Sequence, residues 1–250
     1  MSLLAVRSLS SGYGDIQALW DVDMAVQAGQ VTVILGRNGA GKSTLLLTIA
    51  GLLRQKSGSV SLNGADLTGL PTHQRARRGV ALVQENKRIF RQLTVEQNLN
   101  LGGYMLGKQA RKQALSVAYE RFPALAAKRT ASAATLSGGQ QQMLAIAQAL
   151  MPGPALLMLD EPSAGLAPAI VIEVIHTVSA LKTEGLGIVL VEQLVDQAMS
   201  VADHVIVLEH GRSMLSAAAA DVTPRQVREL YLGGGKDHPP QSGAASPGAR

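Results

Sequence analysis

Apolar and polar positions recur with two different periods along this chain, and the changes of period mark where strands give way to helices. Short, largely apolar runs have the length and composition of buried strands, and they span residues 30–35, 80–83, 155–159, 187–191 and 204–208. Apolar residues at helical spacing follow three of these runs, over residues 44–53, 168–184 and 194–202. Strands that alternate with helices predict an α/β fold with a mainly parallel sheet as its core.

Two stretches depart from this alternation. Residues 57–67, SGSVSLNGADL, alternate as a half-buried strand does and turn at Asn63 and Gly64, which predicts an antiparallel β part near the N-terminus. Farther along, helical patterns dominate, and Ser137 is a favourable N-cap for the last of them. These patterns span residues 95–104, 108–121 and 137–149. We therefore expect an inserted helical subdomain over about residues 86–150.

The C-terminal residues 233–250, GGGKDHPPQSGAASPGAR, contain few side chains that a core could bury. Their Gly, Pro and Ser content is typical of disordered segments. We therefore predict one folded domain over residues 1–232 and a disordered tail over residues 233–250.

Composition supports a helix-covered parallel sheet and excludes several kinds of site. Hydrophobic residues make up 46% of the 250 residues but aromatic residues only 3%, which suits helices on a parallel sheet better than a β-sandwich. The absence of cysteine excludes disulfides, Cys-ligated zinc and thiol catalysis. No apolar stretch approaches the roughly 18 residues of a membrane span, and the start, MSLLAVRSLSSGYG, lacks the pattern of a signal peptide. We expect the protein to stay in the cytosol.

Positive charge is concentrated in one part of the chain. Residues 71–129 contain twelve Lys or Arg and three Asp or Glu, a local charge of +9, whereas the whole chain carries +5. Such a bias indicates either a solvated face or a surface that meets nucleic acid or anionic lipid headgroups.

The strongest chemical signal is GRNGAGKST, which satisfies the phosphate-loop pattern GxxxxGK[ST] between a predicted strand and a predicted helix. In such a loop, backbone N–H groups and the helix N-terminus hold phosphates. Lys42 would reach the β and γ phosphates of a nucleotide, and the Ser43 hydroxyl would ligate Mg²⁺. The candidate ATP-binding residues are Gly36, Arg37, Asn38, Gly39, Ala40, Gly41, Lys42, Ser43 and Thr44.

A second motif, ALLMLDEPSAGL, begins at residue 155 with a buried strand and ends it on two carboxylates. In a parallel sheet this strand delivers Asp160 and Glu161 to the same edge as the phosphate loop. Asp160 can hold the Mg²⁺ shell, and Glu161 can polarise an attacking water.

With these motifs and LSGGQQQMLAIAQAL, residues 136–150, the chain resembles the ATP-binding cassette family over residues 3 to about 232. The family signature falls on Leu136, Ser137, Gly138, Gly139 and Gln140. These residues open a helix whose N-terminal amides and dipole can face a γ-phosphate. The resemblance implies that this phosphate belongs to the ATP of a second subunit, because cassettes of the family pair head to tail.

Two further positions take a role by the same resemblance. Tyr13 stands where the family stacks an aromatic ring on adenine, although an ordinary surface tyrosine explains it as well. Residues 163–166, SAGL, match the segment that crosses the dimer interface in the family.

The chain also departs from the family pattern. Gln193 stands where most members have a histidine that contacts the γ-phosphate, and Glu85 stands where they have a glutamine that senses Mg²⁺ and the transport partner. A shift of one residue would return the second role to Gln84. Gln193 offers amide N–H donors but cannot carry a proton as histidine does, and Glu85 could ligate Mg²⁺ directly or repel the γ-phosphate.

Because Lys42, Ser43, Asp160 and Glu161 are intact, we expect slow to moderate ATP hydrolysis with Glu161 and Gln193 as catalytic residues. The Mg²⁺ ligands would be Ser43, Asp160 and Glu85. Alternatively, the pair at 192–193 caps the following helix and has no catalytic meaning.

The segments ENKRIFRQLTVEQNL, LDEPSAGLAP and VEQ look like one ATPase subunit of bacterial importers for branched-chain amino acids. The resemblance implies a second ATPase subunit, two membrane permease subunits and, indirectly, a periplasmic solute-binding protein. The isolated chain could also pair with itself. The protein would then lie peripherally on the cytoplasmic face of the inner membrane, with its basic region near the permeases and anionic headgroups. Leucine, isoleucine and valine are inferred as solutes by resemblance only.

Other classes fit less well. Relatives that import urea and short amides have a similar pattern, and cassettes of exporters or lipid-transport systems remain rivals. Cassettes that act on DNA or ribosomes carry a long heptad insert or a second cassette copy, and this chain has neither. A small-molecule kinase has no reason to carry LSGGQ. We therefore expect no nucleic-acid partner.

Overall fold

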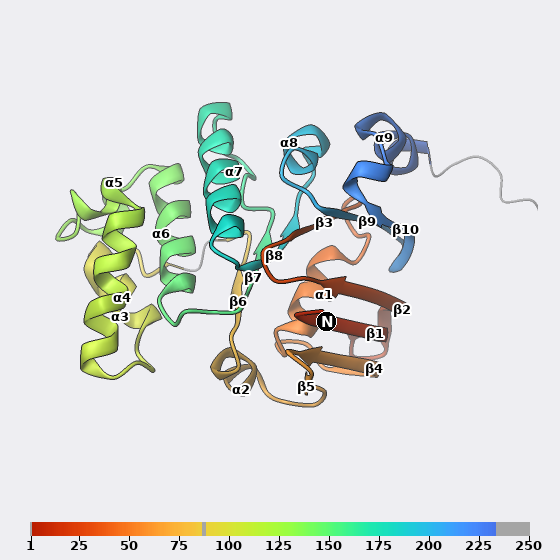
Figure 1. The fold of residues 1–250 in the computed structure, drawn as a ribbon, viewed down its shortest axis with the longest axis horizontal. Coiled ribbons are helices and arrows are strands. Elements are labelled where there is room, and N and C mark those ends of the chain that lie inside the picture. Colours follow the sequence, from red (N-terminus) through yellow and green to blue (C-terminus); the bar gives the residue numbers. More distant parts are fainter. Residues whose placement is uncertain (1, 87–88, 234–250) are drawn as a thin grey trace, which may run out of the picture.

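The computed structural model describes residues 2–86 and 89–233, which form two β-sheets with helices between and beside them (Figure 1). Within these residues the strands are β1 (Leu4–Tyr13), β2 (Ile16–Val26), β3 (Val31–Leu35), β4 (Gln55–Leu62), β5 (Ala65–Asp66), β6 (Val80–Val83), β7 (Leu156–Asp160), β8 (Gly187–Val191), β9 (His204–Glu209) and β10 (Arg212–Ala218). The helices are α1 (Lys42–Ile49), α2 (Thr72–Arg77), α3 (Val95–Gly102), α4 (Lys108–Arg121), α5 (Pro123–Ala126), α6 (Gly138–Leu150), α7 (Pro168–Thr183), α8 (Val195–Met199) and α9 (Pro224–Gly233), with 3₁₀ turns at Ala133–Thr135 and Ala219–Asp221.

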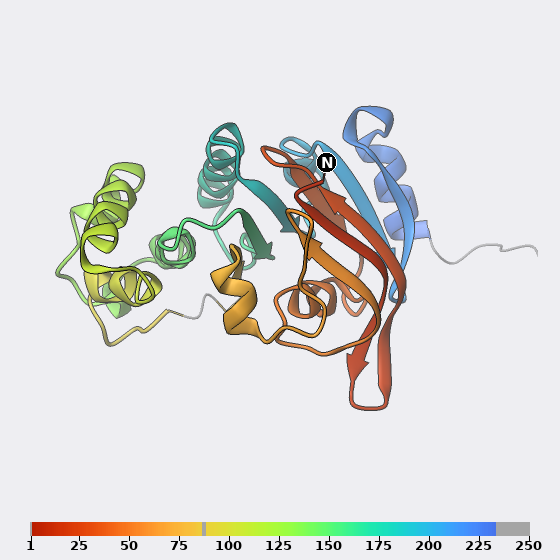
Figure 2. The ribbon, with the colours of Figure 1, turned by 60° about the horizontal axis from the view of Figure 1, so that its bottom comes forward.

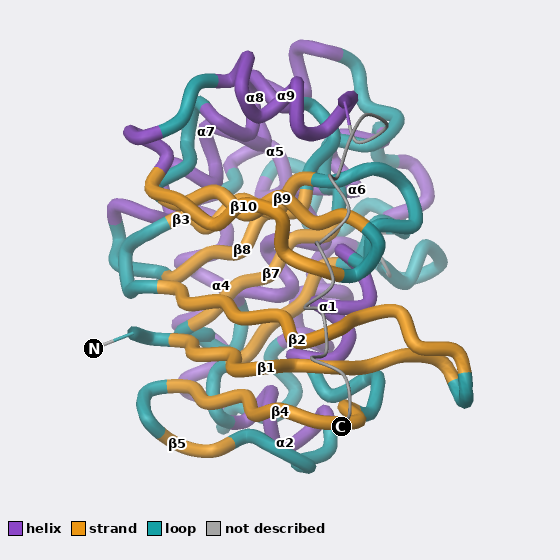
Figure 3. Tube along the Cα trace, turned by 90° about the vertical axis from the view of Figure 1, so that its right-hand side faces the viewer, coloured by secondary structure: helices purple, strands orange, loops and turns teal. Residues whose placement is uncertain are grey.

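The larger sheet has the strand order β10-β9-β3-β8-β7-β6. In Figure 3, its strands β8 and β7 lie above the strands β2, β1, β4 and β5 of a second, smaller sheet. Neighbouring strands of the larger sheet pair in parallel, except that β10 pairs antiparallel with β9. The predicted α/β class is confirmed, and each of its five predicted strands lies within one residue of the expected bounds. The sequence did not indicate β10, because most of its side chains are exposed and its apolar signal is weak.

The smaller sheet is antiparallel, with the order β2-β1-β4-β5. Its hairpin of β1 and β2 projects beyond the rest of the sheet (Figure 2). Asn63 and Gly64 join β4 to β5 with φ values of 51° and 77°, as a tight hairpin turn requires. The antiparallel N-terminal part that the sequence predicted is therefore present.

Helix α1 lies between the two sheets, and this arrangement buries both faces of the larger one. Leu45 and Leu46 of α1 are buried in a core with the smaller sheet and with Ile34 of β3. The neighbours of Ile34 on β3, Val33 and Leu35, belong instead to the core formed with α6 and α7. Because alternate side chains of a strand point to opposite faces, burial on both sides explains the unbroken apolar runs.

Helix α1 is shorter than the predicted 44–53 because a glycine ends it. Gly51 has a left-handed φ of 76°. Its N–H donates to the carbonyl of Thr48, and the N–H of Leu52 donates to that of Leu47. These two bonds form the Schellman motif that terminates many helices.

The helices α3, α4, α5 and α6 gather on one side of the molecule, beyond the β6 edge of the larger sheet (Figure 1). Ser137 caps α6 as predicted, through a reciprocal pair of hydrogen bonds with Gln140. The predicted helix over 194–202 is shorter, because α8 spans only Val195–Met199. Within the described residues, no helix has both the length and the apolar content that a bilayer-crossing segment needs. The predicted tail lies outside them, apart from Gly233.

Candidate functional site

Three neighbouring strands of the larger sheet bring the candidate residues together. Strand β8 lies between β3 and β7. Strand β3 leads into the loop that begins at Gly36. Strand β7 ends at Asp160, directly before Glu161, and Gln193 lies two residues after the end of β8. In open α/β sheets this edge, at the carboxyl ends of the strands, is where ligands bind. The strand order therefore makes one site from three segments that are spread over residues 36–193 of the sequence.

The phosphate loop depends on glycine where its backbone passes close to other elements. A Cβ on Gly36 would lie 2.4 Å from the carbonyl oxygen of Leu208, and one on Gly41 would lie 2.8 Å from the Leu19 side chain. Gly41 also has a φ of 102° and is the N-cap of α1. Since glycine has no side chain to cap the helix, the first-turn N–H groups of α1 stay available to an anion.

Lys42 is buried and holds the loop and a carboxylate together. Its Nζ donates to the carbonyl oxygens of Gly36 at 2.7 Å and Arg37 at 3.2 Å, and lies 3.4 Å from Oε1 of Glu161. The side chain is only 4% exposed. A buried cation whose partners are two carbonyls and one carboxylate is well placed to exchange them for phosphate oxygens.

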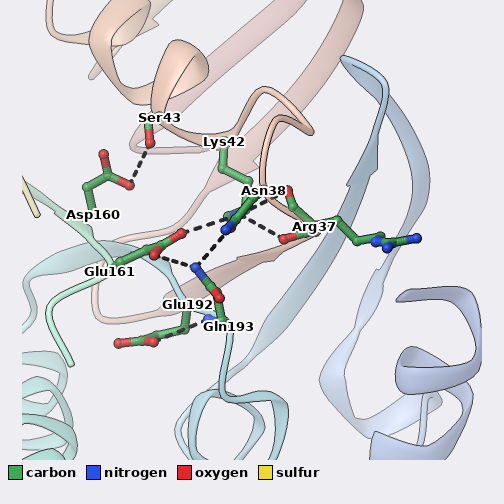
Figure 4. Close-up of polar contacts among 9 residues, drawn as sticks. Arg37, Asn38, Lys42, Ser43, Asp160, Glu161, Glu192 and Gln193 are labelled. Carbon is green, nitrogen blue, oxygen red and sulfur yellow. Dashed lines mark hydrogen bonds and ion pairs between the residues drawn. The ribbon is translucent and has the colours of Figure 1, made fainter. Parts of the chain in front are cut away.

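Asp160 at the end of β7 faces Ser43 in the first turn of α1. The Ser43 Oγ donates to Oδ1 of Asp160 at 3.1 Å (Figure 4). Burial raises the pKa of the Asp160 carboxyl, and the neighbouring charges of Glu161 and Glu85 raise it further, against the hydrogen bond from Ser43. This concentration of carboxylates favours a cation, and an all-oxygen donor set suits Mg²⁺. The residues present therefore fit a magnesium ion.

Glu85 belongs to this site and Gln84 lines another cavity. Glu85 lines the cleft with Lys42 and Ser43, whereas Gln84 lines a cavity with residues of α2 and α3, including Thr72. Glu85 therefore lies beside the candidate Mg²⁺ ligands, and its role there, like the alternative at Gln84, stays a prediction.

Gln193 lies between the phosphate loop and the carboxylate of Glu161. Its Nε2 donates to Oε2 of Glu161 at 2.6 Å and to Oδ1 of Asn38 at 3.0 Å (Figure 4). The alternative that residues 192–193 cap a helix is wrong, because the N-cap of α8 is Leu194 and receives no side-chain cap. The Glu192 carboxylate instead accepts the backbone N–H of Ser163 at 3.1 Å.

Tyr13 stands at the open end of the same cleft. Its hydroxyl lies 3.4 Å from Oγ1 of Thr44, and the residue is 51% exposed. The cleft has a volume of about 430 Å³, within the usual range for small-ligand sites. Its lining residues are Tyr13, Ala18, Asn38, Gly39, Gly41, Lys42, Ser43, Thr44, Glu85, Glu161 and Gln193. Sequence reasoning missed Ala18, which lies on a strand that carried no motif.

The signature segment lies apart from this cleft. Ser137 and Gln140 line a different cavity with residues of α7, and no residue lines both. Ser137 and Gly138 are exposed at the start of α6, while Leu136 is buried. A Cβ on Gly139 would lie 2.5 Å from Ile170, so glycine lets α6 pack closely on α7 there. The described part of the chain therefore does not bring its signature to its own phosphate loop.

Comparisons with known proteins agree with this geometry. The family model for ABC transporters matches residues 19–164. The chain is 44% identical, over 93% of its length and all of the relative, to the high-affinity branched-chain amino acid transport ATP-binding protein BraG of Pseudomonas aeruginosa. It is 38% identical, over 88% of its length and 94% of the relative, to a probable branched-chain amino acid transport ATP-binding protein, LivF, of Archaeoglobus fulgidus.

A solved structure gives the same answer for the fold. The ADP conformation of MJ1267, an ATP-binding cassette of an ABC transporter, superposes with a TM-score of 0.80 at 26% identity, over 93% of this chain and 95% of that one. The resemblance seen in the motifs is thereby confirmed at the level of the family. The chain belongs to the ABC transporter family and is one of its ATP-binding, ATP-hydrolysing cassettes.

Proposed function

We propose that this chain is an ATPase subunit of an ABC importer for branched-chain amino acids and that it works as one of a pair of cassettes. The observation that carries the enzymatic part is the contact chain from Lys42 through Glu161 to Gln193, with distances of 3.4 Å and 2.6 Å. It unites a phosphate-binding cation, a carboxylate base and an amide donor in one cleft. The likeness to BraG and LivF supports the solute class.

The residues of the cleft take distinct roles in ATP hydrolysis. The loop amides and Lys42 bind the β and γ phosphates, and the Tyr13 ring stacks on adenine. Ser43, Asp160 and Glu85 hold Mg²⁺, which when bound offsets phosphate charge in the transition state. Glu161 orients the attacking water and accepts its proton. As Lys42 turns to the phosphates, the Glu161 carboxylate exchanges its contact with this cation for the attacking water.

At residue 193 this chain has a neutral glutamine, where most members of the family have a histidine that can carry a proton. The Gln193 amide N–H already binds Glu161, so it orients the base and can also donate to a phosphate oxygen. Because an amide cannot take up a proton at neutral pH, all proton transfer falls to Glu161. We therefore expect hydrolysis that is slow to moderate and does not depend on a titrating group at residue 193.

The exposed start of α6 implies a second subunit. Ser137 and Gly138 present the N-terminal turn of a helix to solvent, apart from the phosphate loop of the same chain. Helix N-termini bind anions. We infer that two cassettes pair head to tail, so that each signature meets the γ-phosphate held by the other chain. The partner is a second ATPase subunit, and the isolated chain can pair with itself.

The remaining partners follow from the transporter class. The pair of cassettes would dock beneath two membrane permease subunits on the cytoplasmic face of the inner membrane, and a periplasmic solute-binding protein would deliver the solute to those permeases. The excess of positive charge over residues 71–129 supports a position close to anionic headgroups. The chain itself would not touch the amino acid.

Mg²⁺-dependent phosphate release by the purified chain tests the enzymatic role. The wild type should release phosphate, and chelation of Mg²⁺ or the substitution Glu161→Gln should lower the rate by about 10²–10⁴, the range for loss of a general base. ATP binding should persist in Glu161→Gln. If both proteins bind ATP and neither turns over, the chain is the regulatory half of a pair and the catalytic assignment is wrong.

Uptake measurements test the solute. Cells that lack their own branched-chain uptake systems would receive this chain with candidate permease subunits and a binding protein from the same organism. Accumulation of labelled leucine, isoleucine and valine should depend on Lys42. Uptake of urea or short amides instead of these amino acids would overturn the solute class and leave the ATPase assignment intact.

A further inference from the structure

Glu192 is a buried carboxylate that the mechanism above does not use. It follows β8, is 2% exposed, and its backbone N–H donates to the carbonyl of Ile34 at 3.3 Å. Burial raises the pKa of the Glu192 carboxyl, while hydrogen bonds from Ser163 and Gln193 act in the opposite direction. A carboxylate is rarely removed from water without several donors that satisfy it. The donors that bind the Glu192 carboxylate therefore indicate its role.

Both carboxylate oxygens of Glu192 are engaged, and each binds a segment of the catalytic cleft. Oε1 accepts the backbone N–H of Ser163 at 3.1 Å, and Oε2 accepts the backbone N–H of Gln193 at 3.3 Å. Ser163 is 5% exposed and lies two residues after Glu161. One side chain thus ties the turn after β7 to the turn after β8.

The turn that Glu192 holds contains an unfavourable backbone conformation. Glu161 has a φ of 47°, which a residue with a Cβ adopts only when its surroundings impose it. Its N–H donates to the carbonyl of Val191 at 3.0 Å, and its carbonyl accepts the N–H of Ala164 at 3.1 Å. The hydrogen bond from Ser163 to Glu192 holds the same turn at a third point, between Glu161 and Ala164. Without this bond, the backbone at Ser163 loses its tie to the end of β8.

We propose that Glu192 is a positioning residue for ATP hydrolysis: its carboxylate holds the turn 161–166 against the end of β8 and so fixes Glu161 relative to Gln193. This inference rests on the proposed catalytic role of Glu161. Residues 163–166 are also the segment assigned to the subunit interface. A partner that contacts this segment would therefore act on the catalytic carboxylate through Ser163 and Glu192.

The two acceptor oxygens explain why the residue is a glutamate. Glutamine has the same shape but only one acceptor, and its NH₂ group would face one of the two backbone N–H donors. The variant Glu192→Gln therefore keeps the volume of the site and breaks one of the two ties. Glu192→Ala breaks both and leaves buried donors unpaired. The glutamine variant is thus the cleaner probe.

The test compares the full-length wild type with Glu192→Gln and with Glu120→Gln, a matched change on an exposed glutamate of α4. In Glu192→Gln, kcat should fall by about tenfold to hundredfold, as small misplacements of catalytic groups do. KM for ATP should stay within about twofold, because the hydrogen bonds to the Glu192 carboxylate come from Ser163 and Gln193, which lie outside the phosphate loop. Glu120→Gln should match the wild type in both.

Amide hydrogen exchange supplies a readout that does not depend on turnover. Exchange in the peptide that covers residues 161–166 should become about tenfold faster in Glu192→Gln, while the phosphate-loop peptide 36–44 stays unchanged. If kcat and exchange both match the wild type, the proposal is overturned. It is also overturned if exchange rises throughout the protein and kcat falls only with the folded fraction, since Glu192 would then serve stability alone.

A wild type without ATPase activity would refute the proposed catalytic role of Glu161 separately. In that case the exchange measurement still decides whether Glu192 holds the turn. Local acceleration at 161–166 would support the positioning of this segment, and unchanged exchange would refute it.

Discussion

The cleft at the carboxyl ends of β3, β7 and β8 and the first turn of α6 are built in opposite ways. In the cleft, the charges of Lys42 and Glu161 and the amide of Gln193 satisfy one another within the chain. At α6, Ser137 and Gly138 lie exposed at a helix N-terminus. The first region is a nearly complete binding site, whereas the second has the chemistry of an anion site and, within the described residues, lines a cavity that shares no residue with the phosphate-loop cleft. The proposed head-to-tail pairing explains this difference, because each region would supply what the other lacks.

The largest expected effect comes from breaking the cleft at Lys42. Lys42→Ala removes the cation that the loop carbonyls and Glu161 share and that we assign to the phosphates. ATP hydrolysis should fall by about 10²–10³, as for loss of a preorganised charge donor, and calorimetry should show weakened ATP binding. Lys56→Ala, which removes an exposed lysine of β4, is the control. Turnover of Lys42→Ala within tenfold of the wild type would contradict the assignment.

A smaller effect is expected at the signature residue Ser137, and it should change turnover but not ATP binding by the single chain. Ser137→Ala removes the cap of α6 and one donor to the partner's phosphate, so kcat should fall by about tenfold or more while ATP binding by the single chain is unchanged. Thr94→Ala is a matched control, because Thr94 and Gln97 form the same capping box at α3. Each change costs about 1 kcal/mol of stability. Equal loss of activity in both variants would mean that only helix stability matters.

A comparable or smaller effect is expected at Gln193, which lies inside the cleft. Gln193→Ala leaves Glu161 and Asn38 without their shared donor, and kcat should fall by about tenfold. Gln193→His should keep turnover within a few-fold of the wild type, because an imidazole N–H can replace the amide donor. Steady-state phosphate release as a function of pH checks both. Gln193→Ala with unchanged kcat would show that the amide plays no part in hydrolysis.

The smallest effect is expected at the rim of the cleft. Tyr13→Ala removes the proposed stacking partner of adenine, and KM for ATP should rise by about twofold to tenfold, the equivalent of 0.5–1.5 kcal/mol. The kcat should not change, because in the proposed arrangement the ring contacts adenine and not the γ-phosphate. Tyr13→Phe keeps the ring and loses the 3.4 Å contact with Thr44. An increase in KM for Tyr13→Phe as large as for Tyr13→Ala would assign the effect to the hydroxyl.

The sequence predicted those parts of the fold and site that depend on local patterns. The parallel strands were evident because both faces of the larger sheet are buried, and burial leaves long apolar runs. The phosphate loop and the Asp160–Glu161 pair were evident because strand, loop and helix follow directly in the chain. Glu85, which spacing assigned to the Mg²⁺-sensing position, lines the cleft, and its role there stays a prediction.

Other features depend on contacts between distant segments, which no local pattern reports. Glu192 and Ser163 lie 29 residues apart in the sequence, and their hydrogen bond follows from the pairing of β7 with β8. The alternative of a helix cap at 192–193 failed for that reason, since the carboxylate faces the neighbouring turn. Strand β10 was missed because its exposed side chains leave no apolar run.

If the two regions complete each other across a pair of chains, ATP should join two chains only when the first turn of α6 can meet the partner's phosphate. The decisive measurement is the molecular mass of Glu161→Gln with ATP and Mg²⁺, by size-exclusion chromatography with light scattering, beside the double variant Glu161→Gln/Ser137→Arg. The single variant should double its mass with ATP, whereas the double variant should bind ATP and stay a monomer. Equal dimerisation of both variants, or a single variant that binds ATP and remains monomeric, would contradict the proposed pairing.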